Sequence, residues 1–283
     1  MHTRLPDQPL QPDQDTSRWD GHAGAYETIF EGLTDAFAAR ALDLLEPLAG
    51  ARVMDLAAGT GGAAIQAAAR GAHVSAFDGS NVMVTRIRAR SINTSITAEQ
   101  ADARNKLPRA DGSFDAALSC LGVVLLPEPV PALHEIARVL RPGGRLAVVT
   151  WTEPGRYELA ARLRAAVEKV RGAPPPPPPT PPAQLRYVDP DVFVALLREG
   201  GFAVSAVERV EAFLHASSAR ALAGNLDFAP GMEHLMASLG PDRIAVEQEF
   251  AAALEVEQGL GPVALRAVAL IAIAIADSAK NDA

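Results

Sequence analysis

The sequence predicts an α/β protein with a doubly wound, mostly parallel sheet of seven strands. Short apolar runs alternate with helical patterns from residue 52 to residue 151, which is typical of a parallel sheet with helices on both faces. A carboxylate and a glycine-rich loop follow the first apolar run. The final apolar run, Val263–Ala276, is shorter than the roughly 20 residues that span a bilayer, so it indicates a buried last strand.

The individual elements follow from the spacing of apolar residues. Residues 19–49 are expected to be helical, because apolar side chains recur at helical spacing. This apolar stripe consists of Ile29, Leu33, Phe37, Leu42 and Leu45. The elements expected next are strand 52–56, helix 62–70, strand 72–77, helix 81–91, strand 95–100, strand 114–119, helix 130–140 and strand 145–151.

Beyond residue 151 the sequence predicts further helices and the last two strands. A helix is expected over 157–171, followed by a proline-rich connector over 172–186. Its prolines fit neither a helix interior nor a sheet interior, and a stiff spacer is favoured over an SH3-type ligand. Asp189 and Pro190 form the N-cap and first turn of the next helix.

A helical insertion is expected between the last two strands. The sixth strand lies near 203–213, and residues 217–260 then have mostly helical character. Ser217 or Ser218 is placed to cap the first helix of this insertion. Insertions at the C-terminal edge of a sheet are expected to contact ligands.

The composition favours one domain over residues 19–283, preceded by a disordered tail over 1–18. The tail is polar, contains prolines and holds no apolar segment of the signal-peptide type. The net charge of -8 and the pI of about 5.3 argue against nucleic-acid and membrane partners, which require a basic face. The single cysteine, Cys120, excludes an internal disulfide and indicates a reducing, cytoplasmic compartment.

The most informative motif is Val53–Gly62, in which an apolar run ends in Asp55 and a small-residue loop leads to an alanine-rich helix. Such a unit grips a nucleotide-like cofactor at the C-terminal edge of a parallel sheet. Glycine lets the backbone approach the ligand, and the helix N-terminus offers free N–H groups. Residues 59–64 also satisfy the pattern G-x-G-x-x-A, so this loop alone fits a dinucleotide enzyme, or a tight turn without a ligand.

Further motifs follow downstream in a fixed order. The second predicted strand ends at Asp78, where a ribose-binding carboxylate is expected. The third strand ends in the sequence Ala-Asp-Ala at residues 101–103. The fourth is introduced by residues 111–115, and the helix after it ends in the turn Arg-Pro-Gly-Gly-Arg at residues 141–145.

Together these motifs resemble the class I S-adenosylmethionine (SAM)-dependent methyltransferases, most closely the branch with the ubiquinone and menaquinone C-methyltransferases. The resemblance covers about Trp19–Trp151 and continues more weakly over Tyr187–Phe202. It implies a Rossmann-like fold, SAM as the cofactor and a helical cap formed by residues 19–49. A nicotinamide oxidoreductase would explain neither Asp55 nor the Arg-Pro-Gly-Gly turn.

The resemblance also assigns roles by position. The acid of the first strand and its glycine loop hold the methionine end of SAM, Asp78 holds the ribose hydroxyls, and the pair Asp102 and Ala103 meets the adenine. Aromatic rings in the cap suit a sulfonium, because a cation favours a π face. The expected cofactor-binding residues are Trp19, Tyr26, Asp55, Ala57, Gly59, Gly61, Asp78, Gly79, Met83, Asp102, Ala103 and Ser119.

Residue 57 departs from the family pattern, which usually has glycine where this chain has Ala57. Alanine adds one methyl group and tolerates negative φ. We therefore expect the site to be retained if Ala57 avoids the left-handed conformation. The departure bears on affinity and not on the identity of the site.

Methyl transfer from a sulfonium is an in-line displacement, so the enzyme mainly aligns the reacting atoms and excludes water. A base is needed only for a protonated nucleophile, and His22 in the cap is the catalytic candidate. Residues 119–122 carry no Asn-Pro-Pro-Tyr-like motif, which marks enzymes that methylate nitrogens of DNA or amides. They also lack the carboxylates of a Mg²⁺ site, so no metal is expected.

The acceptor is expected to be a small, largely apolar metabolite, methylated on carbon or oxygen in preference to nitrogen. The candidate acceptor-binding residues are Leu121, Phe228, Met232 and His234. Leucine and methionine make an adaptable apolar lining, although the same side chains could equally pack the insertion onto the sheet. An NAD(P)-dependent oxidoreductase and a SAM-binding module without catalysis remain as alternatives. The sequence predicts neither the acceptor's identity nor the oligomeric state.

Overall fold

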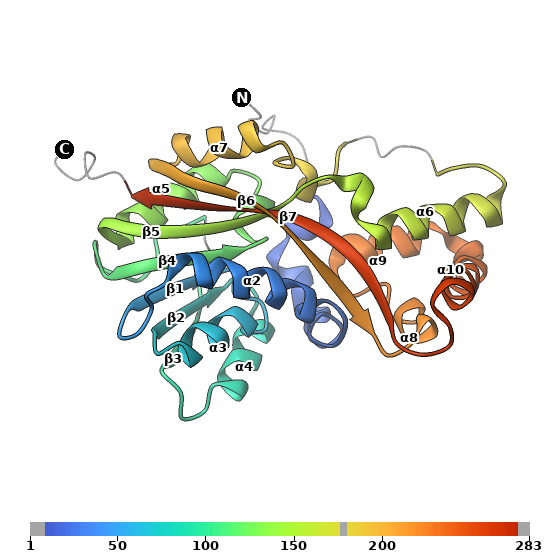
Figure 1. The fold of residues 1–283 in the computed structure, drawn as a ribbon, viewed down its shortest axis with the longest axis horizontal. Helices are drawn as coiled ribbons and strands as arrows, with labels where there is room; N and C mark the ends of the chain where they lie inside the picture. Colours follow the sequence, from blue (N-terminus) through green and yellow to red (C-terminus); the bar gives the residue numbers. More distant parts are fainter. Residues whose placement is uncertain (1–8, 103, 176–179, 277–283) are drawn as a thin grey trace.

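The computed structural model describes residues 9–102, 104–175 and 180–276 of the 283-residue chain. Its centre is one seven-stranded sheet with the order β3-β2-β1-β4-β5-β7-β6 (Figure 1). The strands are β1 (Arg52–Leu56), β2 (His73–Asp78), β3 (Ile96–Gln100), β4 (Phe114–Cys120), β5 (Leu140–Trp151), β6 (Phe202–Ala216) and β7 (Val263–Ala276). The first five strands are parallel, and β7 runs antiparallel between β5 and β6. The predicted fold class is confirmed.

Helices cover both faces of the sheet (Figure 1). The α-helices are α1 (Ala23–Ala25), α2 (Glu31–Leu45), α3 (Gly62–Ala69), α4 (Asn81–Arg90), α5 (Pro129–Val139), α6 (Glu158–Arg171), α7 (Pro190–Glu199), α8 (Ala219–Ala223), α9 (Pro230–Ser238) and α10 (Arg243–Gln258). Shorter 3-10 turns are η1 (Pro12–Gln14), η2 (Thr16–Gly21), η4 (Val123–Leu125), η5 (Pro154–Arg156), η6 (Ala183–Leu185) and η7 (Gly240–Asp242), and Tyr26–Phe30 (η3) is π-helical.

Two apolar layers hold the helices on the sheet. Alternate residues of β7 face opposite sides, so Ala269 and Ile271 join one layer while Leu270 and Ala272 join the other. The first layer contains α2 and α3 and continues into the insertion. The second contains α5 and α7. Burial of β7 on both faces explains why its sequence is almost continuously apolar.

The N-terminal cap is helical but not one continuous helix. The segment 19–49 is divided into η2, α1, the π-helical turn and α2, and α2 ends at Leu45. The predicted apolar stripe is buried along its whole length. The cap therefore presents one apolar face to the sheet, as its periodicity predicts.

Residues 9–18 correct the prediction of a disordered tail. They form η1 and the start of η2, and their polar side chains bond to distant parts of the chain. The Gln14 amide donates to the Leu125 carbonyl, and the Asp13 carboxylate accepts from the Gly231 N–H at 2.7 Å. Polarity does not indicate disorder here, because these side chains bond to partly buried backbone groups of other segments. Residues 1–8 lie outside the described residues.

The helical insertion before the last strand is confirmed. It consists of α8, α9, η7 and α10, which lie with α6 beyond the far ends of β6 and β7 (Figure 1). Ser218 caps α8 by accepting from the Ala221 N–H. The predicted N-cap of α7 is also present, since Asp189 accepts from two N–H groups of the first turn. Part of the proline-rich connector, 176–179, lies outside the described residues, and its role as a spacer remains a prediction.

Candidate functional site

The loop after β1 carries the backbone geometry that glycine permits. Gly59 and Gly61 have φ values of +55° and +93°, and Gly61 is the N-cap of α3. Left-handed φ is costly for residues with a Cβ, so these two positions need glycine. The loop lies at the C-terminal edge of the sheet, beside the ends of β2 and β4. This is the edge where open α/β sheets bind ligands.

Ala57 adopts the left-handed conformation, with φ of +57°. The condition under which we expected the site to be retained, that Ala57 avoids this region, is therefore not met. The strain of an alanine there is on the order of 1–2 kcal/mol. Its methyl group is accommodated by Gly122 after β4, where a Cβ would lie only 2.3 Å from the Ala57 Cβ. Because the Ala57 methyl group occupies this space, residue 122 in the facing loop has to be glycine.

Asp78 at the end of β2 holds the glycine loop. Its carboxylate accepts from the Gly59 N–H and from the Ser80 N–H, each at 2.8 Å. Burial raises the pKa of Asp78 to about 6, although these backbone hydrogen bonds lower it. The predicted ribose-binding acid therefore lies beside the loop that the sequence assigned to the methionine end.

Asp55 at the end of β1 is the most deeply buried carboxylate of the site, with 3% of its surface exposed. Its Oδ2 has no hydrogen-bond partner among the described residues. Burial, followed by the nearby charge of Asp78, raises the pKa of Asp55 to about 7. A buried carboxylate oxygen without a partner is costly, so it marks a place where a donor from a ligand would be stabilised.

The cap lies directly on the glycine loop. The Tyr26 ring comes within 3.4 Å of the position that a Cβ on Gly59 would take, and the Tyr26 hydroxyl bonds to Thr34. Trp19 packs edge-to-face on Tyr26, with ring centroids 6.0 Å apart. Tyr26 therefore lies over the glycine loop, and Trp19 supports its ring from the side.

Two polar contacts fasten the cap to the loop. Glu31 of α2 accepts from the Thr60 hydroxyl and from Arg90 of α4. The cavity that remains under the cap is about 20 Å³. Sites for drug-sized ligands measure about 300–1,000 Å³. Binding of a nucleoside cofactor therefore requires the cap side chains over the loop to move.

Several predicted cofactor residues have other contacts. Ser119 is fully buried, donates to the Leu56 carbonyl and accepts from the Val123 N–H, so it joins β1 to the turn after β4. Met83 on α4 is 2% exposed, and its N–H donates to the Ser80 hydroxyl. These contacts give both residues a supporting role, and their predicted contacts with the cofactor remain predictions.

At the predicted adenine end of the site, Asp102 and Gly79 already contact other residues of the chain. Asp102 is half-buried, and its carboxylate pairs with Arg104 at 2.6 Å, which holds the pKa of Asp102 below its usual range. Ala103 lies outside the described residues. Gly79 is in close contact with the N-terminal segment, since a Cβ there would lie 2.8 Å from the Thr16 side chain.

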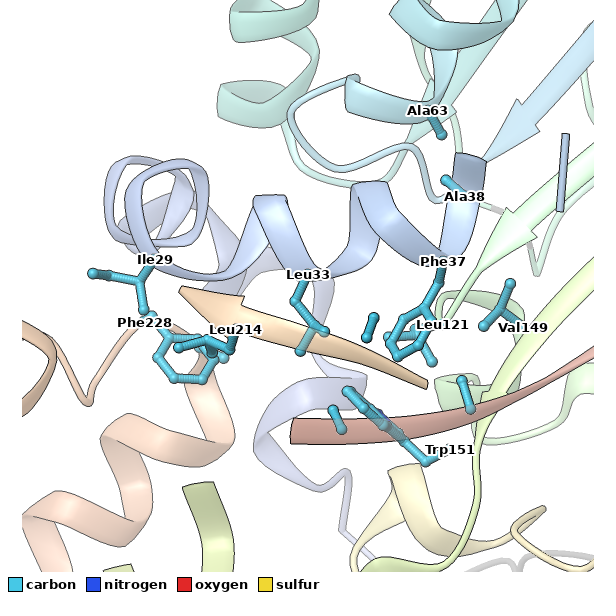
Figure 2. Close-up of a cluster of buried hydrophobic side chains, with 14 of the residues drawn as sticks. Ile29, Leu33, Phe37, Ala38, Ala63, Leu121, Val149, Trp151, Leu214 and Phe228 are labelled. Carbon is cyan, nitrogen blue, oxygen red and sulfur yellow. The ribbon is translucent and has the colours of Figure 1, made fainter. Parts of the chain in front are cut away.

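The predicted acceptor residues are not brought together. Figure 2 shows Phe228 beside Leu214 and Ile29, whereas Leu121 lies near Phe37, further along the cap helix. Phe228 is 2% exposed and stacks on Phe30 of the cap, with ring centroids 4.8 Å apart. Phe228 therefore packs the insertion against the cap.

The remaining acceptor candidates differ in exposure. Met232 on α9 packs against the same apolar layer, whereas His234 is exposed on α9. His234 thus lies on the surface of α9, whereas Phe228 is buried before that helix begins, and a contact of His234 with the acceptor remains a prediction.

His22 faces the insertion. Its Nδ1 lies 2.8 Å from the Arg18 carbonyl, and its Nε2 lies 3.7 Å from the Glu233 carboxylate of α9. A carbonyl accepts, so Nδ1 carries the proton when the ring is neutral and Nε2 is the free base. His22 is not among the residues that line the cavity under the cap.

Sequence reasoning missed the polar residues of α2. Glu31, Thr34 and Asp35 line the cavity with Asp55, yet in the sequence they are only polar positions between members of an apolar stripe. Their one-turn spacing, i to i+3 or i+4, is the signal that a shared helix face could have provided.

The described residues contain neither a membrane-spanning helix nor a cluster of metal ligands. No helix in the described part of the chain is both long and apolar enough to cross a membrane. Within residues 9–102, 104–175 and 180–276, no group of three or more histidine, cysteine or acidic side chains is arranged to hold a metal ion.

Comparison with known proteins points to one family. Residues 53–144 match the family described as "Methyltransferase domain". An uncharacterised protein of Mycobacterium tuberculosis is 35% identical over 137 residues, which is 48% of each chain. The demethylmenaquinone methyltransferase of Clavibacter sepedonicus is 42% identical over 109 residues, which cover 38% of this chain and 44% of the relative. The chain thus spans about half the length of the curated relatives it matches.

Solved structures share the fold over most of the chain. The YcgJ protein from Bacillus subtilis has a TM-score of 0.54 and 17% identity, covering 86% of this chain and 99% of that one. The [4+2]-cyclase SpnF has a TM-score of 0.52 and 21% identity, covering 86% and 80%. At these identities the similarity shows the fold alone.

Proposed function

We propose that this chain, a member of the class I SAM-dependent methyltransferases, transfers the methyl group of SAM to a small, largely apolar metabolite. The observation that carries the proposal is the pair of buried carboxylates at neighbouring strand ends. Asp78 holds the glycine loop, and Asp55 has a buried oxygen without a partner among the described residues. These residues fit a ligand that brings both hydroxyl and ammonium donors to one edge of the sheet.

Bound SAM would supply an electrophilic methyl group on sulfur. The chain's own residues then have three tasks. Asp55 and the loop 57–61 hold the methionine end, Asp78 accepts hydrogen bonds from the ribose, and Tyr26 covers the sulfonium with its ring. The cap excludes water from this edge, which favours an in-line displacement.

The acceptor side supports an apolar substrate. Phe30 stacks on Phe228, Trp151 stacks on Tyr157 at 5.0 Å, and Phe30 lies 6.1 Å from Trp151. This aromatic cluster begins at Tyr26, whose ring is 5.7 Å from Phe30. An acceptor that enters between cap and insertion would meet these rings, which suit a flat, apolar molecule. We favour transfer to carbon or oxygen over transfer to nitrogen.

His22 remains the proposed base for an acceptor that carries a proton. Its Nε2 is the free nitrogen of the neutral ring and lies 3.7 Å from the Glu233 carboxylate. The ring lies between cap and insertion and would reach the acceptor only after these segments separate. We further propose a cytoplasmic location, since the lone Cys120 suits a reducing compartment.

The alternatives make different predictions. An NAD(P)-dependent oxidoreductase would bind a nicotinamide cofactor, whereas the matched family is a methyltransferase domain. A SAM-binding module without catalysis is the second alternative, because a methyltransferase-like fold does not by itself establish methyl transfer.

The experiment is a screen of quinone-like, phenolic and polyketide-like acceptors with isotopically labelled SAM, read by mass spectrometry. Labelled product with any acceptor class supports methyl transfer and identifies the methylated atom. SAM binding without product across the panel favours the non-catalytic module. Absence of SAM binding contradicts the proposed function.

A further inference from the structure

The cavity under the cap is unusually rich in acids for its size. It lies between α2, the end of β1 and the first turn of α3. Its lining includes the carboxylates of Glu31, Asp35 and Asp55, together with the Thr34 hydroxyl and the Cys120 thiol. Three carboxylates around about 20 Å³ repel one another unless a positive charge lies between them.

One acid in the cavity is deeply buried and lacks a partner. Asp55 is 97% buried, and its Oδ2 has no hydrogen-bond partner among the described residues. The Ala64 N–H at the start of α3 bonds to the Asp55 carboxylate and lowers its pKa, although burial raises it more. The free oxygen is therefore the unsatisfied acceptor of the cavity.

The two acids of α2 differ in whether a cation is paired with them. Glu31 is paired with Arg90 at 2.5 Å and also bonds to Thr60. Asp35 has no salt bridge in the part of the chain that the structure describes. Glu31 thus holds the cap in place, while the charge of Asp35 is left without a paired cation.

Asp35 reaches the site because residue 62 is glycine. A Cβ on Gly62 would lie 1.9 Å from Asp35 Oδ1, so any side chain there would displace the carboxylate. This contact places Asp35 at the first turn of α3, on the same cavity as Asp55. Two acids from separate segments, one in the cap and one in the sheet, therefore face the same small space.

Size and charge define what can bind there. A space of this volume holds one water-sized group, and a primary ammonium has that size and three donors. A carboxylate would be repelled by the lining. An amino-acid moiety would therefore enter with its ammonium end first.

We propose that Asp35 is a cofactor-recognition residue of the cap, and that with the free oxygen of Asp55 it binds the α-ammonium group of the cofactor's methionine moiety. The inference rests on the proposed function, because it assumes a cofactor that carries an amino acid. The contact between Asp35 and the ammonium group would stabilise the closed position of the cap over the cofactor.

The proposal couples cofactor binding to protonation. Burial and the charge of Glu31 raise the pKa of Asp35 to about 6, and Arg90 lowers it. Burial and the charge of Asp78 on β2 also raise the pKa of Asp55. Cys120 on β4 and Tyr26 in the cap face the same cavity, and burial raises the pKa of each. An ammonium favours the ionised carboxylates, so its binding releases protons and tightens as pH rises through this range.

The test compares two ligands and two variants by calorimetry. S-adenosylhomocysteine carries the ammonium, and 5′-methylthioadenosine lacks the amino-acid moiety. Asp35→Asn is close in shape to the native side chain. Asp43→Asn is the matched control, because Asp43 lies on the same helix but is exposed and paired with Arg70 at 2.8 Å.

We expect Asp35→Asn to weaken the binding of S-adenosylhomocysteine about tenfold to hundredfold, which is the loss of affinity typical of a charged hydrogen bond. Methylthioadenosine affinity should not change, and Asp43→Asn should bind both ligands normally. The ligand-free Asp35→Asn protein should melt at a higher temperature than wild type above about pH 7, because a half-buried charge that repels Glu31 is removed. A merely structural residue would not gain stability and lose affinity together.

The outcomes separate the two claims. If wild type binds neither ligand, the proposed function fails. If wild type binds S-adenosylhomocysteine and Asp35→Asn binds it equally well, the assignment of Asp35 is overturned while the function stands. An equal loss for both ligands also overturns it, since the variant would then have disturbed the adenosine site.

Discussion

The two sides of the candidate site are built in different ways. The cofactor edge, defined as the loops after β1 and β2 with residues 57–61 and 78–80, consists of backbone N–H groups and short carboxylates. The acceptor side, defined as the facing surfaces of the cap and the insertion 217–260, consists of stacked aromatic rings. The cofactor edge is assembled by adjacent strands, whereas the acceptor side joins segments about 200 residues apart in the sequence.

The two sides should therefore respond differently to substitution. Cofactor-edge residues are held by hydrogen bonds to their own loops, so changes there should alter affinity more than folding. Acceptor-side residues are part of the apolar layer, so changes there should alter folding as well as binding.

The largest effect is expected on the acceptor side, from Phe228→Ala. Loss of a buried ring that stacks on Phe30 should cost about 3–5 kcal/mol in the free energy of unfolding. Met232→Ala, at a partly buried position, should cost less and reduce acceptor turnover while SAM affinity is retained. Urea unfolding and calorimetry with SAM check the pair. A Phe228→Ala protein of wild-type stability would contradict the packing role.

On the cofactor edge, Asp78→Ala should weaken SAM binding by about 1.5–3 kcal/mol, the value of charged hydrogen bonds. The structure adds a second cause, because Asp78 also holds the Gly59 N–H. Calorimetry with SAM on protein of verified fold measures the loss. Unchanged affinity in a folded variant would remove Asp78 from the site.

A double substitution tests the contact between Ala57 and Gly122. Gly122→Ala places two Cβ atoms 2.3 Å apart and should destabilise the protein by about 1–3 kcal/mol. Adding Ala57→Gly should restore most of that loss, since it removes the opposing methyl and the left-handed alanine. Thermal unfolding of both variants and the double variant provides the cycle. Simple additivity of the two effects would show that the residues do not compensate.

The buried acids predict how stability depends on pH. Asp55 and Asp78 have pKa values raised to about 7 and about 6, above the ordinary value of 3.8. The folded state therefore keeps protons that the unfolded chain releases, so the stability of the ligand-free protein should fall as pH rises from about 4 to about 7. The slope is at most about 1.4 kcal/mol per pH unit for each acid. Urea unfolding across this range should show the fall, and Asp55→Asn should reduce it; a rise instead would contradict the raised pKa values.

The smallest effect is expected from the connector. Shortening the proline run between Pro174 and Pro182 by a few residues should leave SAM affinity unchanged, because a spacer contributes no ligand contact. Calorimetry on the folded deletion variant checks this. A large loss of affinity would mean that the segment closes over the cofactor.

The sequence predicted where the residues of the cofactor edge lie in the fold, for a physical reason. Asp55, Gly59, Gly61 and Asp78 are set by local rules, in which a strand ends, a loop turns and a helix begins. The strands and helices of the sheet were predictable as well, because each has its own periodicity of apolar residues in the sequence. Even so, the backbone of Ala57 could not be foreseen, because the room for its methyl comes from Gly122, on a different strand's loop.

The acceptor side and the N-terminal segment were harder to predict. Asp13 caps α9 from 218 residues away, and the short polar segment around it carries no periodicity that would reveal this partner. In the sequence, Asp35 is one of several polar residues on an amphipathic helix. Only the fold shows that it lies against Gly62. His234 is expected from the sequence to supply a polar group to a pocket of the insertion, whereas its side chain is exposed on α9.

The most direct measurement is a calorimetric titration of the full chain with SAM, S-adenosylhomocysteine and NAD under one set of conditions. The central claim is that the carboxylates after β1 and β2 hold a SAM-type cofactor. We predict saturable binding of SAM and S-adenosylhomocysteine, lost or strongly weakened in Asp78→Ala, and no binding of NAD. Binding of NAD with no binding of SAM would contradict the claim.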